Sequence, residues 1–319
     1  MLFRTTQPLR APLTRALQLE LCPPPSVYLA DGFSVLIAMC VEEGDDIRAH
    51  SERAWRAHAE RLRTDGAGKI QCEFRVVANL KELHATLNER SYSMLVVIAH
   101  GIRPGRVAGL RIGADNVFDL GTRLPPIVIV SACAAWPRAS GAVSIADLAL
   151  RRGAVTVIGT LAPIHVAHHE LVATRIFTYM IDSLLGREPE TTLAEVVHRA
   201  LSSHAVFDVV AGSKRVHAWA VERGLKAGSP SEEFMSKRSA GRLRTGTIYA
   251  DTEAVLAEIA DDDSPDRGDS LRQFFRSGSY LPESLLYVTL GWPEQVILQP
   301  RLPFEAEVRA RRANSAPGT

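Results

Sequence analysis

The sequence predicts an α/β domain in which a mostly parallel β-sheet is flanked by helices on both faces. Stretches of strand length recur along the chain, and longer stretches with helical spacing of apolar residues separate them. Most of the strand-like stretches are continuously apolar, which is typical of strands buried on both faces. Strands that alternate with helices form parallel sheets, because each helix returns the chain to the same edge.

The predicted elements follow one another in a regular order. Five strand-like stretches lie at residues 33–41, 72–79, 94–101, 125–133 and 155–164. Helical patterns lie at residues 47–63, 80–90, 144–152, 168–185 and 192–206. Residues 106–120 alternate between apolar and polar side chains and turn at Gly113 to Asn116, which predicts a β-hairpin. Residues 284–291 predict a further edge strand. Two polar stretches, residues 226–246 and the acidic residues 261–269, predict exposed loops.

Composition and charge exclude several classes of function. The chain has 319 residues, of which 46% are hydrophobic, and a formal net charge of +1. No basic face is evident, so we expect no direct nucleic-acid partner. No apolar run approaches the roughly 20 residues that span a bilayer, so we expect no membrane partner. No GxGxxG motif and no glycine-rich stretch ending in Gly–Lys–Ser/Thr is present, so we expect no cofactor.

The cysteines favour a reducing compartment. Cys22, Cys40, Cys72 and Cys133 lie far apart, with no CxxC pair. Cys40 and Cys72 fall inside strand-like stretches, where a reduced, buried thiol is expected. This pattern suits the cytoplasm better than an oxidising compartment.

Two residues that suit nucleophilic catalysis stand at the ends of consecutive buried strands. His100, followed by Gly101, ends the third strand-like stretch, and Cys133 ends the fourth. Ligands bind at the carboxyl ends of parallel strands, so we expect both side chains at one rim. There an imidazole can take the thiol proton and later protonate a leaving amine. Gly101 allows a sharp turn, and its amide and that of Cys133 can form an oxyanion hole. The alternative is that both are ordinary strand-end residues.

The segments LVVIAHG, PPIVIVSAC and RRGAVTVIGTLAPI resemble the CHAT family of caspase-like peptidases. This family is similar to caspases, separases and gingipain-type enzymes, in which one hydrophobic block ends in His–Gly and another in Ala–Cys. Further similarity in the later helices and the closing strand extends the resemblance to about residues 33–298. The resemblance implies a caspase-like fold and a cysteine endopeptidase. By this resemblance, His100 is the general base and acid, Cys133 is the nucleophile, and Gly101 is an oxyanion donor.

The resemblance also implies a domain organisation. Residues 27–303 are expected to form the CHAT peptidase domain, after an amphipathic extension at residues 1–26 and before a disordered tail at residues 304–319. Many CHAT chains carry helical repeats ahead of the peptidase, and this sequence does not. Control is therefore expected from a separate sensor or regulatory protein, from the amino-terminal helix, or from processing. A protein substrate in a bacterial defence or programmed-death system is implied; the alternative is a catalytically silent CHAT-fold module that binds a partner.

Acidic residues near this rim suggest a substrate preference. Four follow the first strand and two belong to the hairpin: Glu42, Glu43, Asp45, Asp46, Asp115 and Asp119. In caspases the loop after the first strand supplies an arginine that reads an acidic side chain. Acids at this place instead favour Arg or Lys before the scissile bond, by charge complementarity. In the alternative interpretation, the four acids form a solvated turn that caps the next helix.

The segment HVAHHE raises the question of a metal site. His165 and His169 are four residues apart, a spacing that can hold zinc on a helix. However, the boundary between loop and helix falls between them, and no second cluster of ligands completes a site. We therefore expect no metal here, and a role for these residues and His168 on the helix surface or in a substrate loop.

Overall fold

In the computed structural model the chain folds into two compact units. The sheet unit comprises Thr14–Val197 and Val288–Thr319, and the helical unit comprises Met1–Leu13 and His198–Tyr287. Most of the predicted amino-terminal extension and the whole predicted tail lie outside the described residues. The structure describes residues 24–30, 32–104, 107–133, 143–227, 230, 233–234, 247–277, 280 and 282–299.

Six described strands form the central sheet of the sheet unit, in the order β11-β10-β8-β4-β2-β3. The five strands from β10 to β3 are parallel to their neighbours. The mostly parallel sheet, its five strands and the further edge strand are therefore confirmed. The strands are β2 (Phe33–Met39), β3 (Ile70–Val76), β4 (Met94–Ile98), β8 (Ile127–Ser131), β10 (Thr156–Thr160) and β11 (Tyr287–Gly291).

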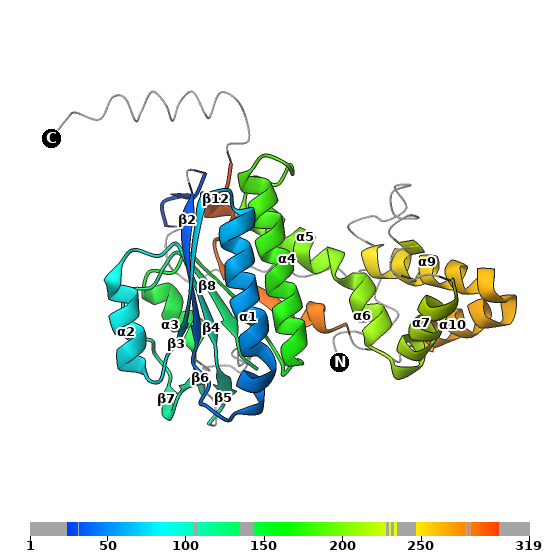
Figure 1. Ribbon diagram of the computed structural model, residues 1–319, viewed down its shortest axis with the longest axis horizontal. Helices are drawn as coiled ribbons and strands as arrows, with labels where there is room; N and C mark the ends of the chain where they lie inside the picture. The colour runs from blue at the N-terminus through cyan, green and yellow to red at the C-terminus, as the bar shows by residue number, and fades with distance from the viewer. Residues whose placement is uncertain are drawn as a thin grey trace. The chain divides into compact units, whose positions relative to one another are not determined.

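Helices cover both faces of this sheet, with α2 and α3 on one side and α1 and α4 on the other (Figure 1). The alternation of side chains along each strand supplies both cores. Along β2, Leu36 and Ala38 belong to the core under α2 and α3, and the equally buried Val35 and Ile37 point to the opposite layer. The helices are α1 (Asp46–Asp65), α2 (Leu80–Glu89), α3 (Ile145–Arg151) and α4 (Val166–Leu184).

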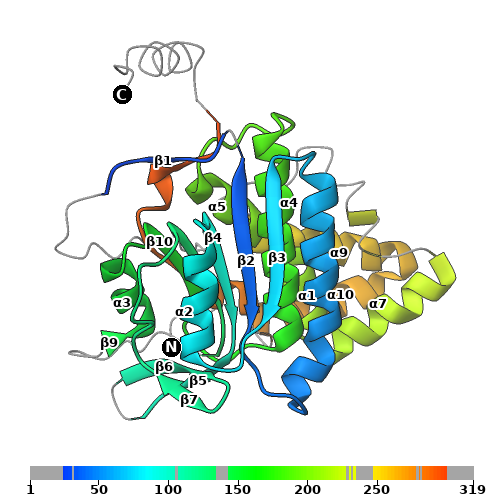
Figure 2. The ribbon, with the colours of Figure 1, turned by 60° about the vertical axis from the view of Figure 1, so that its left-hand side comes forward.

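A small second sheet continues from the end of β4. Its strands β5, β6 and β7 are antiparallel neighbours, so the predicted hairpin is confirmed, with Gly113 in the turn at a φ of 56°. The predictions that His100 and Cys133 end central strands were wrong. β4 stops at Ile98 and His100 begins β5, and β8 stops at Ser131, two residues before Cys133. Figure 2 shows this sheet beyond the ends of the central strands. The strands are β5 (His100–Ile102), β6 (Val107–Ile112), β7 (Asp115–Val117) and β9 (Val143–Ser144), which pairs with β6.

Short elements complete the sheet unit, and α5 carries the chain across the boundary between the units. β1 pairs in parallel with β12. No helix in the part of the chain that the structure describes is long and apolar enough to cross a membrane. The elements are β1 (Val27–Tyr28), β12 (Val296–Ile297), the 3₁₀ helix η3 (Pro293–Gln295) and α5 (Leu193–Ser203).

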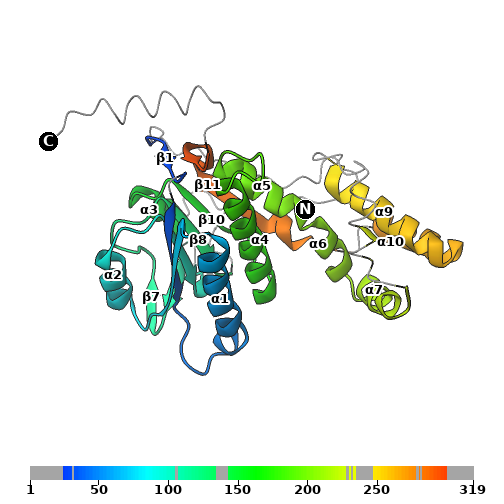
Figure 3. The ribbon, with the colours of Figure 1, turned by 45° about the horizontal axis from the view of Figure 1, so that its top comes forward.

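The helical unit has its own core, rich in aromatic side chains. Phe275 and Tyr280 pack edge to face, with ring centroids 6.1 Å apart, and Tyr249 and Phe234 are fully buried. Figure 3 shows α9 and α10 side by side in this unit. Its elements are α6 (Ala205–Ala211), α7 (Lys214–Ala227), α9 (Ile248–Asp263), α10 (Pro265–Ser277) and the 3₁₀ helix η2 (Glu283–Leu286).

The acidic stretch 261–269 was predicted to be a loop, and this prediction was wrong. Three aspartates end α9, and α10 begins at Pro265 after the single residue Ser264. Ser264 Oγ accepts a hydrogen bond from the Arg267 amide at 3.3 Å, and proline suits the first helical position. Arg272 of α10 forms ion pairs with Asp261 of α9 and Asp269 of α10, and so links the two helices. The other predicted loop, residues 226–246, lies largely outside the described residues.

Candidate active site

The register of the central sheet brings His100 and Cys133 to the same rim. Ile98 at the end of β4 pairs with Ser131 at the end of β8. His100 and Cys133 each follow two residues after this pair. Because neighbouring parallel strands advance together, the two residues leave the sheet side by side, at its carboxyl end.

Gly101 fixes how closely the two strand ends approach. A Cβ atom on Gly101 would lie 1.7 Å from the carbonyl oxygen of Cys133 and 3.2 Å from its amide nitrogen. Only glycine fits where two backbones come this close. The φ angle of Gly101 is outside the left-handed region, so the expected sharp turn does not explain the glycine. Its role is to allow the main chains of the His–Gly and Ala–Cys motifs to touch.

Asp45 contacts the imidazole of His100 from the loop between β2 and α1. The carboxylate oxygen Oδ2 of Asp45 lies 2.7 Å from Nε2 of His100. Its other oxygen, Oδ1, accepts a hydrogen bond of 2.9 Å from the Ile47 amide and so caps the amino terminus of α1. Both oxygens of Asp45 are therefore engaged, one by the histidine and one by the helix.

This contact determines the tautomer of His100. An ionised carboxylate only accepts hydrogen bonds, so the proton of the neutral imidazole resides on Nε2. The other nitrogen, Nδ1, is then the basic one, and it makes no hydrogen bond within the described residues. Burial acts to raise the pKa of Asp45, but the hydrogen bonds from His100 and Ile47 and the charges of His100 and Arg111 outweigh it. The pKa of Asp45 is lowered as a result, so the carboxylate stays ionised.

The thiol of Cys133 is partly exposed at this rim. Its Sγ lies 3.7 Å from the carbonyl oxygen of Ile164, in the loop between β10 and α4. Among the described residues no hydrogen bond joins Cys133 to His100. Trp136, which follows Cys133 closely in the chain, lies outside the described residues.

Two other cysteines differ sharply from Cys133. Cys40 and Cys72 are buried, as the sequence predicted, and burial raises the pKa of each thiol to about 12. A thiol with such a pKa is almost entirely protonated at neutral pH and is a poor nucleophile. Of the three cysteines in the described part of the chain, only Cys133 is accessible for chemistry.

The six acids predicted to read the substrate are not gathered in one place. Asp45 caps α1, as the alternative interpretation expected, and binds His100. Asp119 forms an ion pair with Arg152. Asp115 lies in β7, where its carboxylate accepts a hydrogen bond of 3.4 Å from the Leu80 amide. The remaining acids are exposed in the loop after β2 or in the first turn of α1: Glu42, Glu43 and Asp46.

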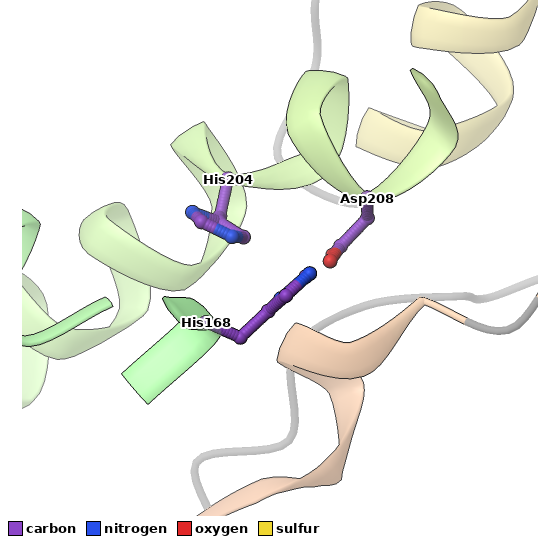
Figure 4. A group of neighbouring side chains, drawn as sticks. All are labelled: His168, His204 and Asp208. Atoms are coloured by element: carbon purple, nitrogen blue, oxygen red, sulfur yellow. The ribbon is translucent and has the colours of Figure 1, made fainter. Parts of the chain in front are cut away.

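The histidines of HVAHHE do not share an environment. His165 is exposed in the loop before α4, whereas His168 and His169 are buried in its first turn (Figure 4 labels His168). Burial, together with the charge of His168, lowers the pKa of His169 to about 3. His169 is therefore neutral. The pair with the zinc-like spacing, His165 and His169, consists of one exposed and one buried ring.

The helical unit contains a separate buried carboxyl group, Asp208. It lies one helical turn after His204, at the start of α6 (Figure 4). Its carboxylate accepts a hydrogen bond of 2.8 Å from the Tyr249 hydroxyl and others from the hydroxyl and amide of Ser284. Burial nevertheless raises its pKa to about 6, against these hydrogen bonds.

No protein-family model matches this sequence, and no curated protein sequence matches it. Solved structures that this chain resembles include the crystal structure of the Drosophila initiator caspase Dronc. It is 13% identical with a TM-score of 0.34, covering 57% of this chain and 75% of that chain. The crystal structure of the Arg-specific cysteine proteinase gingipain R is 11% identical with a TM-score of 0.37, covering 84% of this chain and 48% of that chain.

Proposed function

We propose that this chain is a cysteine endopeptidase of the CHAT type. His100 and Cys133 are its catalytic pair, and Asp45 positions His100. The observation that carries the proposal is the 2.7 Å contact between Asp45 and His100, at the rim where Cys133 leaves the sheet. A nucleophile beside a base that is itself oriented by a third group is the arrangement that covalent catalysis requires.

The first half of the reaction forms an acyl-enzyme. Nδ1 of His100 takes the proton of the Cys133 thiol, and the thiolate attacks the carbonyl carbon of the scissile peptide bond. Asp45 stabilises the imidazolium that results, because its carboxylate already accepts the Nε2 proton. The imidazolium then gives its Nδ1 proton to the leaving amine as the C–N bond breaks, which leaves a thioester on Cys133.

The second half releases the product. Nδ1 of His100 takes a proton from water, which attacks the thioester and frees the carboxylic acid and the thiol. In both halves negative charge develops on the former carbonyl oxygen. The amides of Gly101 and Cys133 are suited to stabilise it, because the backbones of the two residues are in contact.

Charge at the rim supports the proposed preference for Arg or Lys before the scissile bond. Glu42 and Glu43 are exposed in the loop that ends in Asp45, and Asp45 contacts His100 of the proposed pair. Unlike those of Asp45 and Asp119, their side chains make no hydrogen bond or ion pair with the described residues. They are therefore available to a basic side chain, with which charge complementarity favours binding.

A catalytically silent module that binds a partner through the same rim is the second candidate. The hydrogen bond from Cys133 to Ile164 favours it, because the thiol is directed at a carbonyl group instead of the imidazole. The two candidates differ in thiol reactivity. A peptidase reacts with a substrate-like electrophile at Cys133 in a His100-dependent way, and a silent module does not.

The deciding experiment is cleavage of a panel of fluorogenic peptides by the wild-type chain. We expect Cys133→Ala and His100→Ala to abolish cleavage, and Cys72→Ala, a buried cysteine away from the rim, to retain it. A wild-type chain that cleaves no peptide or protein and shows no His100-dependent labelling of Cys133 would contradict the peptidase function. Peptides with Arg, Lys or Asp before the scissile bond test the basic preference, which equal cleavage after Asp would contradict.

The setting of the enzyme is proposed from the resemblance alone. We propose that it acts in the cytoplasm, in a bacterial defence or programmed-death system, under the control of a separate sensor or regulatory protein. A Cys133→Ala chain keeps the rim but cannot turn over, so it is suited to trap a substrate or regulator. Co-purification with this variant, compared with a His100→Ala Cys133→Ala double variant, tests for a bound protein.

A further inference from the structure

A row of polar side chains crosses the small sheet and starts at His100. In the ladder between β5 and β6, His100 is paired with Arg111, and between β6 and β7, Arg111 is paired with Asn116. Residues paired directly across antiparallel strands project to the same face, with Cβ atoms about 4.5–5.5 Å apart. Imidazole, guanidinium and carboxamide groups therefore stand in line on one face.

The burial pattern shows which face this is. Leu110 and Ile112, the neighbours of Arg111 along β6, are fully buried and belong to the core of the sheet unit. Arg111 itself and Asn116 are exposed, and His100 is partly exposed. The row thus lies on the solvent face of the small sheet, with its first member in the proposed catalytic pair.

Arg111 is available to a ligand. Within the described residues its guanidinium makes no ion pair and no side-chain hydrogen bond, whereas arginines elsewhere in the sheet unit, such as Arg152 and Arg75, have carboxylate partners. No ion pair or hydrogen bond joins it to the nearby carboxylate of Asp45, whose oxygens bind His100 and the Ile47 amide. Even so, the charge of Arg111 helps to lower the pKa of Asp45, which places the guanidinium in the field of the site.

We propose that Arg111 binds an acidic side chain of the substrate, within a few residues of the scissile bond. This inference rests on the proposed peptidase function and adds a specificity residue to it. A guanidinium binds a carboxylate through two parallel N–H donors, which makes arginine better than lysine at this task. The carboxamide of Asn116, next in the row, can add a further donor to the same carboxylate. The substrate would then carry two opposite charges near the scissile bond. A basic group would lie toward Glu42 and Glu43, and an acidic group toward Arg111.

The experiment compares matched peptides that differ only in charge. A cleaved parent peptide is scanned with Glu and Gln at each position around the scissile bond, and kcat/KM is measured for each pair. We expect one position at which Glu is preferred over Gln by about threefold to tenfold, since a partly exposed ion pair contributes modestly. Arg111→Gln should reduce this ratio to about one and leave the Gln peptide nearly unchanged, and Arg111→Lys should keep part of it. Arg123→Gln, at the opposite end of the strands, is the control and should keep the full ratio.

The outcomes separate this inference from the function on which it rests. If the wild-type chain cleaves peptides but shows no position with a Glu preference, or if the preference survives in Arg111→Gln, the role of Arg111 is wrong and the peptidase stands. If Arg111→Gln lowers kcat/KM equally for all peptides, Arg111 acts on the catalytic pair and the inference is also overturned. If the wild-type chain cleaves nothing and Cys133 is unreactive, both proposals fail together.

Discussion

Asp45 uses one carboxylate oxygen to begin α1 and the other to hold the imidazole of His100, 55 residues further along the chain. The two contacts are 2.9 Å and 2.7 Å long. The position of α1 and the orientation of the proposed base are therefore linked through a single side chain. Because α1 packs on the central sheet, His100 is fixed relative to the strand ends by the same contact that begins the helix.

Replacement of Asp45 by Asn separates these two roles. Asn caps helices as well as Asp does, so α1 should keep its amino terminus and the chain its stability. With Oδ1 on the Ile47 amide, the amide group of Asn would face Nε2 of His100 and force the proton to Nδ1. We expect kcat/KM to fall by about 10² to 10⁴, as for a base in the wrong tautomer, with little change in KM.

The comparison with Asp45→Ala tests whether capping α1 and orienting His100 are separate roles of Asp45. Alanine removes the cap as well, at a cost of about 1 kcal/mol in the free energy of unfolding. Thermal unfolding should therefore distinguish the two variants while both lose activity. Asp45→Asn with wild-type kcat/KM, measured over a range of pH, would show that His100 does not depend on this carboxylate.

The sequence predicts the framework of the site because that framework depends on periodicity. Continuous apolar stretches mark β4 and β8, and parallel order carries both chain segments to one rim, so His100 and Cys133 could be placed together without coordinates. The roles of Asp45 and Arg111 could not be predicted in this way. Asp45 contacts His100 from a loop of irregular shape. Arg111 is paired with His100 by the register of the hairpin that follows β4. Neither a loop conformation nor a strand register leaves a periodic signal in one sequence.

The acidic stretch between α9 and α10 shows a second limit. A run of aspartates next to proline and glycine is typical of an exposed loop, and local composition predicted one. The structure instead ends one helix and begins the next within it, and Arg272 pairs with the acids across the turn. Both helices bury apolar side chains in the core of the helical unit, and this packing outweighs local propensity at this place.

Thiol labelling should select Cys133 over the other cysteines of the described residues. Burial raises the pKa of Cys40 and Cys72 to about 12, whereas Cys133 is partly exposed at the rim to which the strand register also brings His100. We expect brief treatment with iodoacetamide at pH 7.5 to modify Cys133 at least about tenfold faster than either buried thiol. Peptide mass spectrometry of the native chain measures this. The same treatment of the unfolded chain is the control, in which Cys40, Cys72 and Cys133 should react alike.

His100 should be responsible for part of this reactivity. In His100→Ala the thiol of Cys133 loses its proton acceptor but keeps its exposure, so labelling should slow at pH 7.5 and recover at higher pH. The rate of labelling of Cys133, measured as a function of pH in the wild-type chain and in His100→Ala, tests this. Identical pH profiles for the wild-type chain and His100→Ala would show that the imidazole does not reach the thiol.

Gly101→Ala should separate the two strand ends. The added methyl group would lie 1.7 Å from the carbonyl oxygen of Cys133, so the backbones must move apart. We expect a loss of about 1–3 kcal/mol in the free energy of unfolding and a loss of cleavage that exceeds it, because the oxyanion hole also widens. Gly68→Ala is the matched control: a methyl group there meets no atom within 4 Å, at a φ of 81°. It should cost about 1 kcal/mol of backbone strain and leave kcat/KM unchanged.

The buried carboxyl group of Asp208 makes the stability of the helical unit depend on pH. Its pKa is raised to about 6 by burial, from an ordinary value of 3.8. A carboxyl group with a raised pKa in the folded state binds its proton more tightly when folded. The contribution of Asp208 to the free energy of unfolding is therefore fully favourable below pH 3.8, and it is lost as the pH rises through about 6. Between these two pH values the free energy of unfolding falls by roughly 3 kcal/mol on account of this group.

Tyr249→Phe tests this group, because the Tyr249 hydroxyl donates to the carboxylate at 2.8 Å. A hydrogen bond to a charged group contributes about 1.5–3 kcal/mol and one to a neutral group about 0.5–1.5 kcal/mol. The variant should therefore lose more stability at pH 7.5, where Asp208 is ionised, than at pH 5, where it is protonated. Urea unfolding at both values measures the difference. Tyr280→Phe, which removes a hydroxyl bonded to Glu253 in the same unit, is the control and should lose the same amount at both. Equal losses for Tyr249→Phe at the two pH values would mean that Asp208 does not change its charge between them.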